Sequence, residues 1–292
     1  MKKKIVTWAI LVIPVLLVVI LGSMMGFSFA STKTNKPVLS DSTSQWGAFL
    51  HHETIPEDLE KANPLVFSYE THPPLQSYID RNKTLLAELN VIDVASGELG
   101  YERAEDSKLM MGPSNRDASH MLVDIRKADW KQYLIESKLQ SLLLRRFQGV
   151  YIDSLHEARE LEARDPKRYA GMVASVVEVI KAIRYQYPSV IIAVDYDETL
   201  TPQLLPVVQY VIADSIITTP DAIARPAQES MRALRLLGQW KHQYPQLTVL
   251  VKEQWNQDDS KGQADLANKI RQNGFVPFVR RMADPKVVLR GK

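Results

Sequence analysis

Short apolar runs alternate with longer segments of helical periodicity along most of the chain. Eight of these runs lead into polar side chains, and seven of the eight lead into a carboxylate. The runs are 48–50 before His51 and His52, 65–69 before Glu70, 85–91 before Asp93, 120–123 before Asp124, 149–152 before Asp153, 190–194 before Asp195 and Asp197, 210–213 before Asp214, and 247–251 before Lys252 and Glu253. Runs of this length and composition are typical of buried parallel strands.

The longer segments between the runs predict helices. Within 167–187, six apolar residues recur at the spacing of one helical face, and Pro188 ends the pattern. Residues 130–146, 227–242 and 263–273 behave similarly. Residues 95–119 are weakly periodic and predict an irregular loop. The apolar run 275–279 predicts either an extra strand packed against the rest or an irregular closing segment.

Alternation of strand and helix, repeated eight times, predicts a (β/α)8 (TIM) barrel. The carboxyl ends of barrel strands meet at one face, where catalytic groups of such barrels lie. Helix N-caps favour aspartate and account for two or three of the seven acids. The remaining acids would converge on one cleft.

The first 45 residues differ from the rest in composition. Lys2, Lys3 and Lys4 precede an uncharged apolar run, long enough to span a bilayer, and the lysines predict a cytoplasmic N-terminus. Residues 1–30 are therefore interpreted as a signal peptide or a signal-anchor helix, with membrane contact through residues 5–30. Cleavage after Ala30 would release the protein. Polar residues 31–45 predict a flexible tether, and residues 46–292 form the barrel domain outside the cytoplasm.

Composition narrows the possible functions. The chain has 292 residues, 45% hydrophobic and 24% charged, with a net charge of +2 and no cysteine. Nucleic-acid binding would require a clustered basic face, which this balance does not indicate. The six histidines lack the spacing of metal ligands, so we expect no metal site.

Several segments together resemble a known family. They are Trp46, 85–91, 123–126 followed by Trp130, 149–153, 249–251 and 274–277. Their order is similar to that in glycoside hydrolase family 114, the endo-α-1,4-polygalactosaminidases, with the hydrolase domain of bacterial Pel-polysaccharide enzymes as relatives. The resemblance covers residues 46 to about 285.

The resemblance implies hydrolysis of α-1,4-linked galactosamine polymers without a cofactor. It places a nucleophile at Asp153, after the fifth strand, and an acid/base at Asp214, after the seventh, where the family has a glutamate. Further departures from the family are Gln148, His156, Asp93 and Asp195. Asp214 is one methylene shorter than glutamate, so its carboxyl group lies about one C–C bond further back.

The other strand-end side chains are candidates for binding a polysaccharide, especially a cationic amino-sugar polymer attracted by clustered carboxylates. They are Glu70, Asp93, Asp124, Tyr151, Asp195, Tyr196, Glu253 and Trp255.

Two other functions fit parts of the sequence. A barrel that has lost catalysis could bind polysaccharide during exopolysaccharide assembly. Residues 194–201 resemble the D-x-D-x-T signature of haloacid-dehalogenase-like phosphatases, in which Asp195 would become phosphorylated and Asp197 would act on the leaving group around magnesium.

Overall fold

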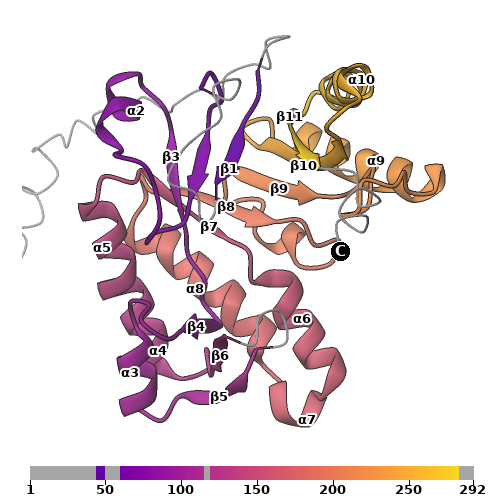
Figure 1. Ribbon diagram of the computed structural model, residues 1–292. Coiled ribbons are helices and arrows are strands. Elements are labelled where there is room, and N and C mark those ends of the chain that lie inside the picture. The colour runs from indigo at the N-terminus through magenta and orange to yellow at the C-terminus, as the bar shows by residue number, and fades with distance from the viewer. Residues whose placement is uncertain (1–43, 50–59, 115–118, 283–292) are drawn as a thin grey trace, which may run out of the picture. The chain divides into compact units, whose positions relative to one another are not determined.

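The computed structural model describes residues 44–49, 60–114 and 119–282, and its main feature is a parallel eight-stranded sheet (Figure 1). Every neighbouring pair in this sheet is parallel, and the strands follow their order in the chain. The strands are β1 (Gly47–Phe49), β2 (Leu65–Phe67), β3 (Leu85–Glu88), β7 (Gly149–Ile152), β8 (Ile191–Asp195), β9 (Tyr210–Asp214), β10 (Thr248–Asn256) and β11 (Val276–Met282).

Trp46 joins the first strand to the last two. Its backbone N–H donates to the carbonyl of Pro277 at 3.2 Å, and its indole Nε1 donates to the carbonyl of Val251 at 3.2 Å. The indole also meets the ring of Phe278 edge-on, with centroids 5.5 Å apart. The sheet is therefore an α/β barrel, as the sequence predicts.

The barrel has an inner and an outer core. The inner core is one cluster of eight buried residues, Trp46, Val66, Leu86, Ala193, Ile212, Leu250, Val276 and Phe278. Alternate residues of a strand point to opposite faces, so the other buried strand residues face outward. They pack in a second, larger cluster with the apolar faces of the helices.

Helices connect most of the strands and cover the outside of the barrel (Figure 1). They are α2 (Gln76–Asp80), α3 (Tyr101–Asp106), α4 (Ala128–Tyr133), η2 (Leu134–Lys138), α5 (Leu139–Leu144), α6 (Leu155–Arg164), α7 (Pro166–Tyr169), α8 (Met172–Gln186), η3 (Thr201–Gln203), α9 (Ala227–Gln243) and α10 (Ser260–Gln272). The segment predicted as one helix over 130–146 runs through α4, η2 and α5, where η2 is a π-helical turn. The segment 167–187 is divided into α7 and α8 at Gly171, which has φ +87°.

The prediction for 120–123 is wrong, because this run is not a barrel strand. As β6 (His120–Val123) it pairs antiparallel with β4 (Asp93–Ala95) and β5 (Met110–Pro113) in a separate three-stranded sheet. Strand β3 pairs directly with β7 instead, through Leu86 and Gly149. An apolar run shows that a strand is buried but not which sheet it joins.

Two further predictions change with this one. The segment 95–119, predicted as an irregular loop, contains α3 and β5. The run at 275–279 belongs to β11, the eighth strand of the barrel. Asp153 therefore follows the fourth barrel strand and Asp214 ends the sixth, rather than the fifth and seventh.

The predicted signal or anchor segment 1–30, most of the predicted tether, and His51 and His52 lie outside the described residues. Within residues 44–49, 60–114 and 119–282, no helix has the length and apolar character needed to cross a membrane.

Candidate functional site

Polar side chains continue the inward-facing rows of the barrel at the carboxyl ends of its strands. Because side chains alternate along a strand, the residues two positions beyond the inner core also face inward. These residues are Glu88 after Leu86, Asp195 after Ala193, Asp214 after Ile212, and Lys252 after Leu250. The sequence therefore changes from apolar to charged where the barrel interior reaches its mouth.

Tyr151 lies among these carboxylates. It pairs in register with Glu88 on one side and Ala193 on the other. Burial raises the pKa of the Tyr151 hydroxyl well above its usual value, and negative charges raise it further. Those charges belong to Asp153, Asp195, Glu88 and Asp214. Four carboxylates, three at the ends of β3, β8 and β9 and one directly after β7, thus converge on one phenol, and we call them the mouth acids.

Asp195 is held by the start of α6. Its two carboxylate oxygens accept hydrogen bonds from the backbone N–H of Leu155 at 3.2 Å and of His156 at 3.1 Å. Burial raises the pKa of Asp195 to about 7, and the nearby charge of Asp153 adds to the shift, although the two N–H groups oppose it. Asp195 therefore favours its protonated form up to about pH 7.

Asp214 is more accessible, with 45% of its side chain exposed. Its carboxylate forms an ion pair with Lys252. It also accepts a hydrogen bond from the Ser215 hydroxyl at 2.8 Å and from the Gln254 amide at 3.4 Å. These three neighbours fix the orientation of a carboxylate at the end of β9.

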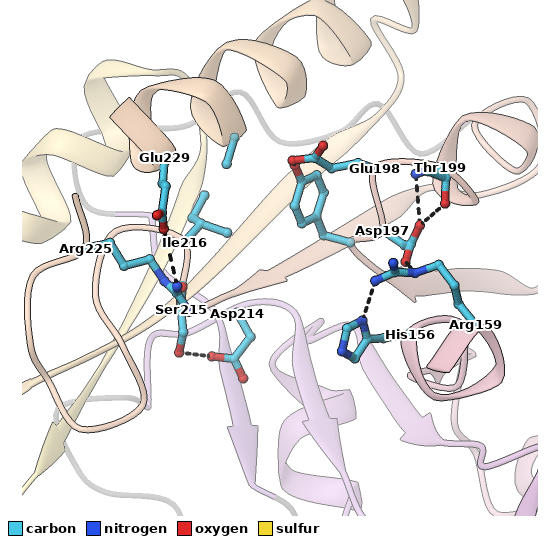
Figure 2. Close-up of a pocket in the computed structure, with 12 residues that line it drawn as sticks. His156, Arg159, Asp197, Glu198, Thr199, Asp214, Ser215, Ile216, Arg225 and Glu229 are labelled. Atoms are coloured by element: carbon cyan, nitrogen blue, oxygen red, sulfur yellow. Dashed lines mark hydrogen bonds and ion pairs between the residues drawn. The ribbon is translucent and has the colours of Figure 1, made fainter. Parts of the chain in front are cut away.

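Asp214 also lines a pocket of about 400 Å³ beside the barrel mouth, which we call the Asp214 pocket. Figure 2 shows its two sides, with His156, Arg159, Asp197 and Thr199 facing Arg225, Ser215 and Glu229. The lining residues come from α6, the turn after β8, the end of β9 and the loop that follows it, and α9. The pocket is lined by His156, Arg159, Tyr196, Asp197, Glu198, Thr199, Asp214, Ser215, Ile216, Arg225, Glu229 and Ala233.

Tyr196, a predicted binding residue, lies in the wall of this pocket. Its ring packs against Trp240 at a centroid distance of 5.6 Å, and its hydroxyl donates to Glu198 at 3.1 Å. Burial, followed by the charge of Glu198, raises the pKa of Tyr196. The phenol therefore remains protonated and keeps its hydrogen bond to Glu198.

Glu253 is a predicted binding residue whose side chain is instead fully buried. Its carboxylate accepts hydrogen bonds from the backbone N–H groups of Ile216, Ile217 and Thr218 and from the Thr218 hydroxyl, at 2.6–2.9 Å. These contacts hold the loop that directly follows Asp214. Glu253 does not line the Asp214 pocket, but it holds in place the loop that contributes Ile216 to the pocket wall.

Two predicted site residues belong to the small antiparallel sheet. Asp93 begins β4, and burial raises its pKa to about 6, with a further contribution from the charge of Glu157 and a smaller one from Asp153. Asp93 therefore interacts electrostatically with Asp153, one of the mouth acids.

Asp124 follows β6 and forms an ion pair with Arg126 at 2.6 Å. Arg126 in turn donates to the carbonyls of Arg168 and Ala170, so this pair anchors local structure.

The remaining predicted residues lie at the edge of the site. Glu70 is exposed in the turn after β2. Trp255 is half-buried, and its indole donates to Asp259 at 3.0 Å. Trp255 is one residue past the inward-facing Gln254, and it packs against the outer core cluster.

The phosphatase motif is divided between separate structural roles. Asp195 binds the start of α6, whereas Asp197 binds Arg159 at 2.6 Å and accepts hydrogen bonds from Thr199 and Leu200. Across the described ranges, no three His, Cys, Asp or Glu side chains group as metal ligands. The two aspartates therefore do not form the paired site that the phosphatase motif requires.

Three residues of the site were missed from the sequence. Glu88 could have been found by counting alternate residues along its strand. Gln254 and Arg225 had no comparable signal, because their contacts depend on how β10 and the loop after β9 meet.

No protein-family model matches the sequence, and no curated protein matches it. Solved structures do match the fold. The glycoside hydrolase domain of PelA from Pseudomonas aeruginosa matches with a TM-score of 0.65 and 17% identity, over 82% of this chain and 96% of that domain. Aspergillus fumigatus Ega3, solved in complex with galactosamine, matches with a TM-score of 0.62 and 10% identity, over 85% and 95% of the two chains.

A third match is a maltogenic α-amylase, AmyB, from Thermotoga neapolitana. Its TM-score is 0.53 at 10% identity, over 83% of this chain and 68% of the amylase. The resemblance inferred from the sequence is thus confirmed at the level of the fold. The chain is a TIM barrel, similar in structure to the glycoside hydrolase domain of PelA and to Ega3.

Proposed function

We propose that the protein hydrolyses a galactosamine-containing polysaccharide, with Asp153 as nucleophile and Asp214 as acid/base. The observation that carries this proposal is the convergence of Asp153, Asp195, Asp214 and Glu88 on Tyr151 at the barrel mouth. Glycoside hydrolysis requires two carboxyl groups that flank the scissile bond. Asp153 follows the fourth barrel strand and Asp214 ends the sixth, so they approach the mouth from two sides.

In the proposed reaction, a carboxylate oxygen of Asp153 bonds to the anomeric carbon as the bond to the leaving oxygen breaks. Asp214 gives its proton to that oxygen, which departs as a hydroxyl. A water molecule then attacks the anomeric carbon, Asp214 takes a proton from it, and Asp153 is released as a carboxylate. Burial raises the pKa of Asp195 to about 7, and a protonated carboxyl group at the barrel mouth supports general acid catalysis there near neutral pH.

An amino-sugar substrate fits the charge of the site. A galactosamine unit with a free amine carries a positive charge, and a barrel mouth rich in carboxylates attracts cations. The galactosamine complex of Ega3, a protein of the same fold, supports the same choice. Neutral glucans would gain no charge attraction from the mouth acids.

The full-length protein incubated with α-1,4-linked galactosamine oligomers should release new reducing ends. Asp153→Asn and Asp214→Asn should each lower kcat by at least about 100-fold, since each removes a catalytic proton or a covalent step. Asp124→Asn is the matched control, because Asp124 is bound to Arg126 outside the barrel sheet. Full activity in the Asp153→Asn variant would disprove the proposed nucleophile.

A polysaccharide-binding barrel without turnover is the second candidate. The ion pair between Asp214 and Lys252 favours it, because the amine competes with a substrate oxygen for the carboxylate. This function predicts that oligomers bind, as measured by calorimetry, while no reducing ends appear. The same incubation therefore separates the two candidates.

A further inference from the structure

The Asp214 pocket is directly connected to the proposed chemistry through one residue. Asp214 is one of the mouth acids around Tyr151 and also lines the pocket. Asp153, the proposed nucleophile, belongs to the mouth acids but does not line the pocket. An acid/base group must touch the oxygen that leaves, whereas the nucleophile must touch the anomeric carbon. The pocket therefore lies on the leaving-group side of the reacting bond.

The charges of the pocket are balanced in pairs. Asp197 binds Arg159 at 2.6 Å, and Glu229 lies 3.8 Å from Arg225. Glu198 binds Arg232, and Asp214 binds Lys252. Each of the four lining carboxylates thus has a cationic partner. Arg159 and Arg225 line the pocket themselves, whereas Arg232 and Lys252 lie outside its lining.

The paired charges of the Asp214 pocket contrast with the charges around Tyr151 at the barrel mouth. Around Tyr151, the charged groups that shift the phenol's pKa are all carboxylates. An ammonium group entering the Asp214 pocket would gain less net attraction than it gains at the barrel mouth, because each carboxylate already has a cationic partner. Hydroxyl and amide groups can instead donate to the remaining lone pairs of these carboxylates without displacing a charge.

We propose that the Asp214 pocket binds the sugar on the leaving side of the scissile bond, and that it prefers an uncharged N-acylated unit to one with a free ammonium. This inference rests on the proposed hydrolase function. In the reaction, the sugar in the pocket accepts the proton of Asp214 on its bridging oxygen and departs with a free hydroxyl. The other sugar keeps its bond to Asp153 until water replaces it.

Partially N-acetylated galactosamine oligomers test this preference directly. Products of the full-length protein should carry N-acetylgalactosamine at the newly formed non-reducing ends, enriched at least about threefold over its share in the substrate. The new ends can be identified by mass spectrometry after labelling with ¹⁸O-water, which marks the matching reducing ends. Random ends, or ends enriched in the free amine, would overturn the inference while leaving the hydrolase function intact. Absence of any cleavage would overturn both.

Charge variants provide a second measurement. Arg159→Gln leaves Asp197 without its cation and should shift the new ends at least about threefold towards the free-amine sugar. Arg232→Gln leaves Glu198 without its cation. Because this pair is more exposed, we expect a smaller shift of the new ends, about twofold, towards the free-amine sugar. Because Arg232 is 74% exposed, this variant keeps the test available if Arg159→Gln fails to fold.

Arg235→Gln is the matched control. Arg235 is exposed, lies on the same helix as Arg232, and does not line the Asp214 pocket. It removes the same charge, and the composition of the new ends should remain as in the unmodified protein. Equal shifts in the Arg232 and Arg235 variants would show that overall charge, and not the pocket, controls the preference.

Discussion

Asp195 and Asp197 are two residues apart, yet their surroundings shift their pKa values in opposite directions. For Asp195, burial dominates and raises the pKa from 3.8 to about 7. For Asp197, burial acts in the same direction, but hydrogen bonds from Thr199 and Leu200 and the charge of Arg159 lower the pKa below its usual value. One carboxyl group therefore favours its protonated form in the folded protein, and the other favours its ionised form.

Unfolding at different pH values should reveal this difference. The folded state holds the proton of Asp195 more tightly than the unfolded state does, so stability should fall as pH rises from about 4 to 7. Asp195→Asn removes this pH-dependent penalty. The difference in free energy of unfolding between the variant and the unmodified protein should therefore change by roughly 2–4 kcal/mol in favour of the variant from pH 4 to pH 8. Urea denaturation at both pH values measures the change.

Asp197→Asn is the comparison for the same experiment. Because the pKa of Asp197 is lowered on folding, its ionised carboxylate stabilises the folded state at every pH above about 3.8, the pKa in the unfolded chain. This stabilisation is lost only when the pH falls below that value. The variant should therefore lose stability at pH 8 and not recover it at pH 5. A similar pH response in both variants would contradict the assigned surroundings.

At the scale of elements, the loop after β9 depends on Glu253 of the neighbouring strand. Glu253→Gln replaces one acceptor oxygen by an NH₂ group, which would face donors on the loop. The free energy of unfolding should decrease by about 2–3 kcal/mol, and hydrogen exchange should accelerate at the amides of Ile216, Ile217 and Thr218. The exposed Glu229→Gln should change stability by less than about 1 kcal/mol.

Strands β7 and β8 approach closely at Gly149. A Cβ added there would lie 2.1 Å from the carbonyl oxygen of Ile191, which belongs to the backbone and cannot rotate away. Gly149→Ala should therefore destabilise the protein by about 3 kcal/mol, measured by thermal or urea unfolding. Gly238→Ala on α9 is the matched control. It has no neighbour within 4 Å and should stabilise the helix by about 0.5–1 kcal/mol.

The sequence predicted elements better than it predicted their partners. Periodicity located the apolar stripe of α8, because every turn of that helix meets the outer core. Periodicity could not assign β6 to the correct sheet, since β6 pairs antiparallel with β4 and β5 and this part of the chain has no clear periodicity. Within the site, the acids at strand ends were visible in the chain. Their distant partners, such as Arg159 and Arg225, depend on tertiary packing that spacing does not encode.

For the whole molecule, the barrel accounts for residues from Trp46 to Met282, and we propose that the segment before it carries the protein to the membrane. If residues 1–30 act as an uncleaved anchor, the full-length protein should sediment with membranes and be released by detergent but not by high salt. Removal of residues 1–30 should leave a protein in the supernatant. Release of the full-length protein by salt alone would contradict an embedded helix, and detection of a shortened N-terminus would indicate cleavage near Ala30.

The contacts of Trp46 affect the order in which the protein can be completed during synthesis. Its backbone and indole bind the carbonyls of Pro277 and Val251, more than 200 positions later in the chain. The first strand must therefore wait, with one edge unpaired, until β11 has been synthesised and has emerged from the ribosome. Contacts between such distant residues slow folding, and an unpaired strand edge is prone to aggregation. In a chain interrupted before β11, the backbone N–H of Trp46 would lack its partner, the carbonyl of Pro277. Nascent fragments of this protein should therefore be targets for chaperones and proteases.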